Sequence, residues 1–166
     1  VTPCRGFFDS VAFTGFKATA RLLPHVTPDN FDEHLAPAYR NLSDSGTSLV
    51  LGAGNVAGIP IADVLTKICV DNRAVLLKMN PVNEHVGPHL EVAFKGLIDA
   101  GYLAICYGGA SVGKQISEHA RVDTLHVTGS DRTYDAIVWG TGKQGAKNKA
   151  LGPKNNERPF SAELDC

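Results

Sequence analysis

The sequence has 166 residues, enough for one domain with a hydrophobic core. Its 16 Lys and Arg residues nearly balance 17 Asp and Glu residues, and the net charge of −1 argues against a general polyanion-binding protein. Hydrophobic residues make up 43% of the chain and charged residues 20%, which is typical of a globular protein and excludes wholesale disorder.

Four patterns that the sequence lacks bear on its cellular compartment and on metal binding: cysteine pairs, a set of metal ligands, a membrane span and a signal peptide. The four cysteines are widely spaced without a C-x-x-C pair, which predicts neither a disulfide framework nor a zinc site. His85 and His89 lack a third ligand, so we expect no metal. No apolar run approaches the roughly 18 residues of a membrane span, and no signal-peptide pattern is present. We therefore expect a cytoplasmic protein without a membrane partner.

Residues 1–46 form the first of two expected parts. Aromatic and β-branched residues in 1–27 show no helical period and predict one or two strands, in a segment similar to a β-hairpin. Residues 28–46 are rich in Pro, Asn, Asp, Ser and Gly. They predict a connector with one short helical turn after Thr27.

The second part, residues 47–166, alternates short apolar runs with amphipathic stretches. Strands are predicted at 48–51, 74–78, 102–107 and 124–128, and helices at 59–70, 90–98, 112–119 and 130–139. This alternation favours an α/β fold, a Rossmann-like parallel sheet flanked by helices. Residues 142–159 hold five basic residues and one acidic residue, and predict a mobile solvated loop rather than a nucleic-acid-binding surface.

The segment GAGNVAG (52–58) follows a predicted strand and begins a predicted helix. It is similar to the dinucleotide fingerprint G-x-G-x-x-G, although the last glycine comes one position late. Where the fingerprint places a ribose-binding acid, after the next strand, this sequence has Lys78, which suits a ribose hydroxyl or a phosphate. A tight turn without a ligand is the alternative interpretation.

Two further segments lie between a predicted strand and a predicted helix. GGASVGKQ (108–115) differs from a P-loop at one position, where Gln115 replaces the hydroxyl residue that binds Mg²⁺. A P-loop-like nucleotide hydrolase is thus a less favoured hypothesis. Thr128-Gly129-Ser130 ends a predicted strand and begins a predicted helix. The unpaired N–H groups at the start of a helix suit a phosphate, and Ser130 is also a suitable N-cap residue for that helix.

Taken in order, these motifs resemble the aldehyde dehydrogenase superfamily over about residues 45–166, closest to a divergent branch. The resemblance implies that the Asn55 amide stabilises an oxyanion and that Glu163 is a general base. It implies that Lys78 contacts the adenosine ribose. The implied cofactor-binding residues are Gly54, Lys78, Asn80, Gly108, Gly109, Gly113, Thr128, Gly129 and Ser130.

The family's Glu-Leu-Gly-Gly continues here as Glu163-Leu164-Asp165-Cys166, and the family's nucleophilic cysteine lies well downstream of the glutamate. We therefore do not assign Cys166 as the nucleophile. The chain starts without Met and stops within what reads as a strand, so we expect a piece of a longer protein that does not turn over alone.

The implied function is that of an NAD(P)-dependent oxidoreductase, which converts an aldehyde to an acid through a thiohemiacetal and hydride transfer. The implied cofactor is NAD or NADP, the partner is a small-molecule aldehyde, and a homo-oligomer is possible. The alternative is a dinucleotide-binding or regulatory module without catalysis.

Overall fold

The computed structural model describes residues 7–12, 14–16, 21–35 and 45–164. The chain divides into two compact units, Val1–Pro37 and Ala38–Cys166. In the first unit the described residues form a short helix, α1 (Phe7–Ala12), and a 3-10 helix, η1 (Phe31–His34). The helical turn predicted after Thr27 is thus confirmed.

The prediction of strands in residues 1–27 is wrong for the described residues, because Phe7–Ala12 is helical and none of the others in this range is in a strand. Phe7 and Val11 are four positions apart, which is the spacing of neighbours on one face of a helix. The strand prediction rested on the aromatic and β-branched composition of the segment, and this helical spacing was too short to outweigh it. The rest of the predicted hairpin falls outside the described residues.

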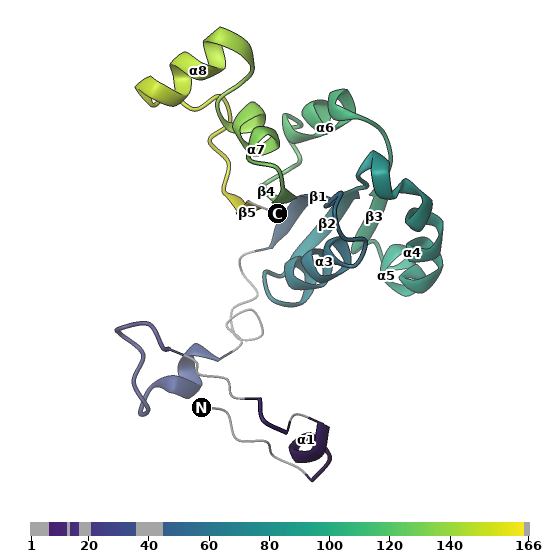
Figure 1. The fold of residues 1–166 in the computed structure, drawn as a ribbon, viewed down its shortest axis with the longest axis vertical. Coiled ribbons are helices and arrows are strands. Elements are labelled where there is room, and N and C mark those ends of the chain that lie inside the picture. The colour runs from purple at the N-terminus through teal and green to yellow at the C-terminus, as the bar shows by residue number, and fades with distance from the viewer. Residues whose placement is uncertain (1–6, 13, 17–20, 36–44, 165–166) are drawn as a thin grey trace. The chain divides into compact units, whose positions relative to one another are not determined.

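The second unit contains a five-stranded sheet with the strand order β3-β2-β1-β4-β5 (Figure 1). Its strands are β1 (Gly46–Leu51), β2 (Arg73–Lys78), β3 (Leu103–Cys106), β4 (Thr124–Gly129) and β5 (Phe160–Leu164). Every pairing is parallel. The predicted α/β fold with a Rossmann-like parallel sheet is therefore confirmed.

Helices connect these strands and pack on both faces of the sheet (Figure 1). They are α3 (Ile59–Cys69), η2 (Pro81–Val86), α4 (Gly87–Ala93), α5 (Lys95–Asp99), α6 (Ala110–Ser117), α7 (Asp131–Val138) and α8 (Gly142–Leu151). None of the helices in the described ranges has the length and hydropathy that crossing a bilayer requires.

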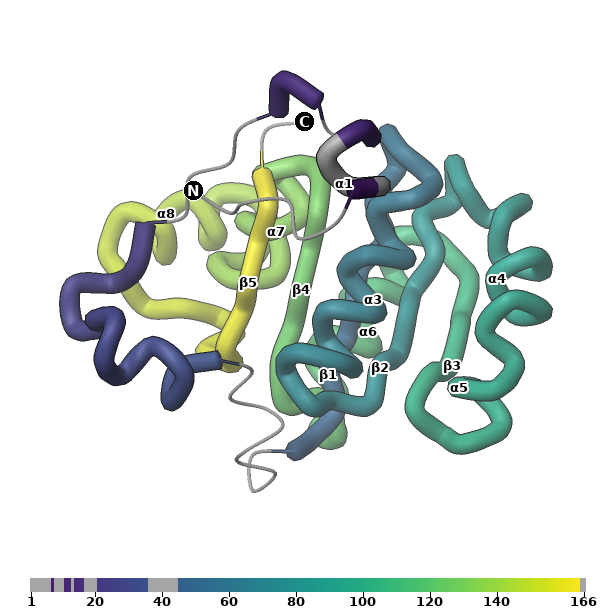
Figure 2. Tube along the Cα trace, turned by 90° about the horizontal axis from the view of Figure 1, so that it is seen from below, coloured from purple at the N-terminus to yellow at the C-terminus, as the bar shows by residue number. Residues whose placement is uncertain are grey.

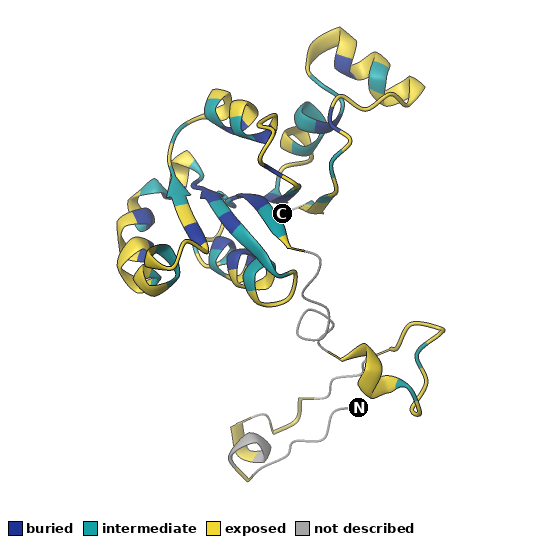
Figure 3. Cartoon of the chain, turned by 180° about the vertical axis from the view of Figure 1, so that it is seen from behind, coloured by how far each residue is buried: buried dark blue, intermediate teal, exposed yellow. Residues whose placement is uncertain are grey.

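The central strand β1 contributes to two separate hydrophobic clusters. Val50 packs in one cluster with Val64 of α3 and Leu90 of α4. Leu49 packs on the other face in a cluster that includes Ile116 of α6 and Ile137 of α7. Burial on both faces explains why the strand is a continuous apolar run rather than an alternating one. Buried residues accordingly concentrate along the central strands (Figure 3).

Helix α8 occupies the first half of the segment predicted to be a mobile loop, so that prediction is wrong for Gly142–Leu151. The helix is held against the preceding loop, because Asn148 Nδ2 donates to the Trp139 carbonyl at 2.9 Å. Gly145 is buried, and a Cβ there would overlap the Gly140 carbonyl group. These contacts need little apolar surface, which explains why hydrophobic periodicity gives no signal for the helix.

We predict that Gly145→Ala lowers the free energy of unfolding by about 1–3 kcal/mol, because the added methyl group overpacks the contact with Gly140. Urea denaturation measures the change. Gly96→Ala is the matched control, since Gly96 is helical and open space surrounds its Cβ position; it should be neutral or slightly stabilising. Equal effects of the two substitutions would contradict the close packing of α8.

Candidate functional site

A change in direction of the sheet's connections lies between the neighbouring strands β1 and β4. From β1 the chain proceeds through β2 to β3 at one edge, whereas β4 is followed by β5 at the other edge. Helix α3, which follows β1, packs on the opposite face of the sheet from α7, which follows β4. Such a switch point separates the two helices and leaves a crevice at the carboxyl ends of the strands.

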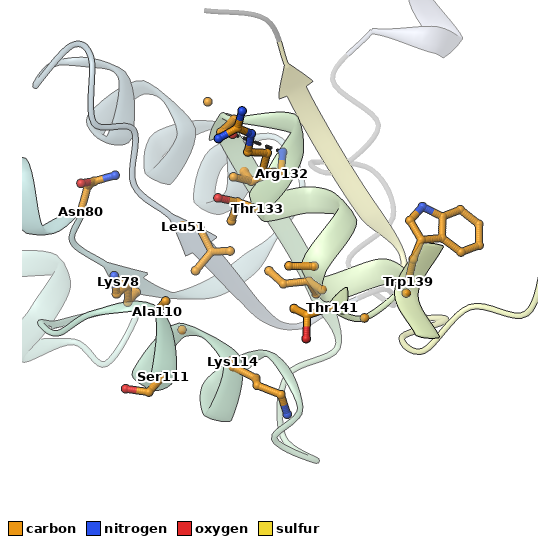
Figure 4. A pocket seen from close by; sticks show the side chains of 18 of the residues that line it. Leu51, Lys78, Asn80, Ala110, Ser111, Lys114, Arg132, Thr133, Trp139 and Thr141 are labelled. Carbon is orange, nitrogen blue, oxygen red and sulfur yellow. Dashed lines mark hydrogen bonds between the residues drawn. The ribbon is translucent and has the colours of Figure 1, made fainter. Parts of the chain in front are cut away.

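A cleft of about 1020 Å³ lies at this switch point, in the second unit alone (Figure 4). The ends of β1, β2 and β4 contribute Leu51, Lys78 and Gly129. Helix α6 lines it with residues that include Ala110, Ser111 and Lys114. The α7 and α8 side includes Arg132, Thr133, Ala136, Ile137, Trp139, Thr141, Gln144 and Asn148.

The start of α7 borders the cleft with backbone donors. Ser130 is the N-cap residue, and its Oγ accepts a hydrogen bond from the Arg132 N–H at 3.2 Å. The preceding Gly129 has φ 139°, and its backbone is open to approach because a Cβ at this position would meet no atom within 4 Å. The positive end of the helix dipole adds to these donors, so the site suits an anion such as a phosphate.

Lys78 ends β2 and is buried to 7% exposure. Burial lowers the pKa of its ammonium group from 10.5, and the nearby Cys106 and Glu84 partly oppose that shift. Burial also raises the pKa of the Cys106 thiol on the neighbouring strand. The desolvated cation of Lys78 gains more from an anionic or hydroxyl-bearing ligand than a fully hydrated lysine would.

The loop after β1 is fixed to the end of β2, which places the predicted glycine motif in the same cleft as Lys78. The Gly52 N–H donates to the Lys78 carbonyl at 2.9 Å. Gly54 lies against Asn80, whose Nδ2 would be 2.9 Å from a Cβ at position 54. Asn55 is exposed in this loop, and its Oδ1 accepts from the Val56 N–H at 2.9 Å.

The charges that line the cleft favour an anionic ligand. Lys78, Lys114 and Arg132 contribute cations, and Glu118 is the carboxylate among the described lining residues. Glu118 is already paired with Lys114, with 2.6 Å between Oε1 and Nζ. Lys78 and Arg132 therefore add positive charge that no other carboxylate of the lining balances, although Glu84 outside the lining acts on Lys78.

The structure brings most of the predicted site residues to the cleft and leaves three outside its lining. Gly54, Asn55, Lys78, Asn80, Gly113, Thr128, Gly129 and Ser130 line it. Gly108 and Gly109 instead form the turn before α6, where the Gly108 N–H donates to Glu84 Oε1 at 2.9 Å. Glu163 is exposed on the edge strand β5, opposite Thr128.

Sequence reasoning missed the residues that α7 and α8 contribute. On α7 the residues Thr133, Ala136 and Ile137 have the spacing of one helix face, so the pattern was available. On α8 the residues Gln144 and Asn148 come from a polar helix that sequence periodicity did not reveal.

The P-loop-like segment and the histidine pair do not form a recognisable metal site. Lys114 Nζ is bound to Glu118 on an exposed surface of α6. Within the part of the chain that the structure describes, no group of three or more His, Cys, Asp or Glu residues is placed to hold a metal ion.

No family model matches this sequence, and a search of curated proteins found no match. The fold is similar to that of succinic semialdehyde dehydrogenase from Streptococcus pyogenes in complex with NADP+ as the cofactor, with a TM-score of 0.53 and 18% identity. That match covers 72% of this chain and 24% of the other chain.

A second solved structure, proline utilization A with proline bound in remote sites, matches with a TM-score of 0.53 and 15% identity. The match covers 73% of this chain and 12% of the other chain, so this chain spans no more than about a quarter of either similar structure. The matched part of this chain, 72% in one comparison and 73% in the other, therefore shares its fold with one part of each of these two larger structures.

Proposed function

We propose that this chain is the dinucleotide-binding part of an NAD(P)-dependent oxidoreductase of the aldehyde dehydrogenase type. One observation carries the proposal: Lys78 and Gly129-Ser130, assigned independently to the cofactor from the sequence, line a single cleft at the switch point of the sheet. The similarity in fold to a succinic semialdehyde dehydrogenase in complex with NADP+ supports it.

The residues of the cleft fit a dinucleotide. Gly129 leaves its backbone open at the start of α7, where N–H groups and the helix dipole favour the pyrophosphate. Lys78 provides a desolvated ammonium for a ribose hydroxyl or a further phosphate. Leu51, Val127 and Ile137 supply apolar surface for a base. NAD and NADP both remain candidates, because the lining holds no carboxylate at the end of β2.

The nicotinamide, when bound, supplies the hydride acceptor for aldehyde oxidation. Asn55 is proposed to donate through Nδ2 to the aldehyde oxygen, where negative charge develops, since its Oδ1 is oriented by the Val56 N–H. Glu163 is proposed as the base that activates water. None of the four cysteines of this sequence is assigned as the nucleophile, and the proposed substrate is a small aldehyde.

A module that binds the dinucleotide without catalysis is the second candidate. The position of Glu163 favours it, because this side chain lies on exposed β5 and not among the residues that line the cleft. Aldehyde-dependent reduction of NAD(P)+ by a longer form of the protein, lost in Glu163→Gln, would favour the enzyme. Binding without such turnover would favour the module.

The first prediction concerns affinity. Trp139 is the only tryptophan of the sequence and lines the cleft, so titration with NAD+ or NADP+ should quench its fluorescence saturably. Lys78→Met removes a cation and Ser130→Asp places a carboxylate beside the pyrophosphate. Each should weaken binding on the order of tenfold.

Lys95→Met is the control, because Lys95 is exposed on α5 and pairs with Asp99 outside the cleft. Its affinity should equal that of the unmodified chain. Absence of saturable binding by the folded chain, or equal weakening by Lys95→Met, would overturn the cofactor assignment.

The second prediction concerns pH. Because burial lowers the pKa of Lys78 from 10.5, its positive charge is lost at a lower pH than that of an exposed lysine. Affinity for NADP+ should therefore fall as the pH rises through this lowered pKa. Calorimetric titrations at increasing pH measure the fall, and Lys78→Met should flatten that part of the profile. An identical profile in Lys78→Met would exclude Lys78 as its source.

A further inference from the structure

A second group of reactive side chains lies on the α3 side of β4 and β5. His126 of β4 and Ser161 of β5 are direct partners in the parallel register. They project away from the cluster that contains Phe160, Leu164 and the α6 and α7 residues, and so lie toward α3. Helix α3 contributes Asp63 and Lys67, which are four residues apart and share one helix face.

Short polar contacts link these residues. Ser161 Oγ lies 2.8 Å from His126 Nδ1, while His126 Nε2 lies 3.2 Å from Thr128 Oγ1 and 3.3 Å from Asp63 Oδ1. The Thr128 hydroxyl donates to the other carboxylate oxygen of Asp63 at 3.1 Å. Because the Thr128 proton is given to Asp63 and a carboxylate only accepts, both neighbours of Nε2 are acceptors. The proton of the neutral imidazole therefore belongs on Nε2, which leaves Nδ1 to accept the proton of Ser161.

The surroundings favour a nucleophilic serine. Lys67 Nζ donates to Ser161 Oγ at 3.1 Å and is held in place by Asp71 at 2.7 Å. Its positive charge stabilises negative charge that develops at or beside the serine oxygen. His126 and Asp63 are buried, at 6% and 8% exposure, whereas Ser161 is exposed to reagents. A nucleophile, a base and a carboxylate thus lie in succession, with the two imidazole nitrogens in the reverse of the roles they have in the serine-protease triad, where Nε2 faces the serine.

We propose that Ser161 is the nucleophile of a second, hydrolytic site, with His126 as its general base and Asp63 as the positioning residue, and that its substrates are short-chain carboxylic esters. The proposed acyl group is short because Ser161 is on an exposed edge strand and does not line the cleft, which would be needed to hold a longer chain. The proposal does not depend on dinucleotide binding.

In the first step Ser161 Oγ bonds to the ester carbonyl carbon, and its proton passes to His126 Nδ1. The bond from that carbon to the alcohol oxygen breaks, and the alcohol leaves with this proton. In the second step a water gives one proton to Nδ1, and its oxygen bonds to the acyl carbon. The bond to Oγ breaks, Oγ recovers the proton, and a carboxylic acid leaves. Thr128 Oγ1 and Asp63 Oδ1 face the Nε2–H throughout, and Asp63 accepts the Thr128 hydroxyl proton in a hydrogen bond.

The test is reaction of the full chain with a fluorophosphonate probe, with mass spectrometry to locate the label, and with p-nitrophenyl acetate to follow turnover. The label should be on Ser161, and Ser161→Ala should abolish both labelling and the burst of p-nitrophenol. His126→Gln should slow both reactions about 100-fold or more. Ser45→Ala is the control and should leave both unchanged, because Ser45 is also an exposed serine.

Thermal unfolding of each variant shows whether a lost reaction reflects lost chemistry or a lost fold. The labelled residue is identified in the unmodified chain, so this measurement does not depend on any variant being folded. Absence of a label on Ser161 in the folded chain would overturn the proposal. So would an unchanged rate in Ser161→Ala, or an unchanged rate in a folded His126→Gln.

Discussion

Two adjacent parallel strands, β1 and β4, send their following helices to opposite faces of the sheet, and the cleft lies at the carboxyl ends of these strands, between α6 on one side and α7 and α8 on the other. The tube in Figure 2 shows the two strands side by side within the sheet, as their register requires. Burial of Leu49 and Val50 on opposite faces fixes β1 in the centre. The rigid strand ends then hold the groups that approach a ligand.

The electrostatics of the cleft follow from this geometry. Lys78 is buried at the end of β2. Its charged ammonium group loses hydration there, and this loss costs free energy. The start of α7 adds a second centre of positive potential at Gly129 and Ser130. An anion that contacts both ends would offset these costs, so ligand binding should also stabilise the fold.

Sequence reasoning worked where a buried face produces a regular pattern. The strands β1 to β4 and the helices α3, α6 and α7 are predictable because their apolar residues have the period of the element. Helix α8 was missed because Gly145 and Asn148 hold it through a backbone contact and a hydrogen bond. The order of motifs along the sequence also does not predict how far a residue lies from the cleft. Glu163 was assigned from that order, yet it is exposed on β5 and does not line the cleft. The pairing of Ser161 with His126 joins residues 35 positions apart, a proximity that only the strand register reveals.

Amide hydrogen exchange of the chain with and without NADP+ tests the central claim most directly, that a dinucleotide binds at the diverging strand ends. Bound NADP+ should slow exchange of the N–H groups of residues 52–55 and 129–132, while exchange in α5 stays unchanged. Unaltered exchange in both loops at saturating NADP+, or protection confined to other parts of the chain, would contradict the account.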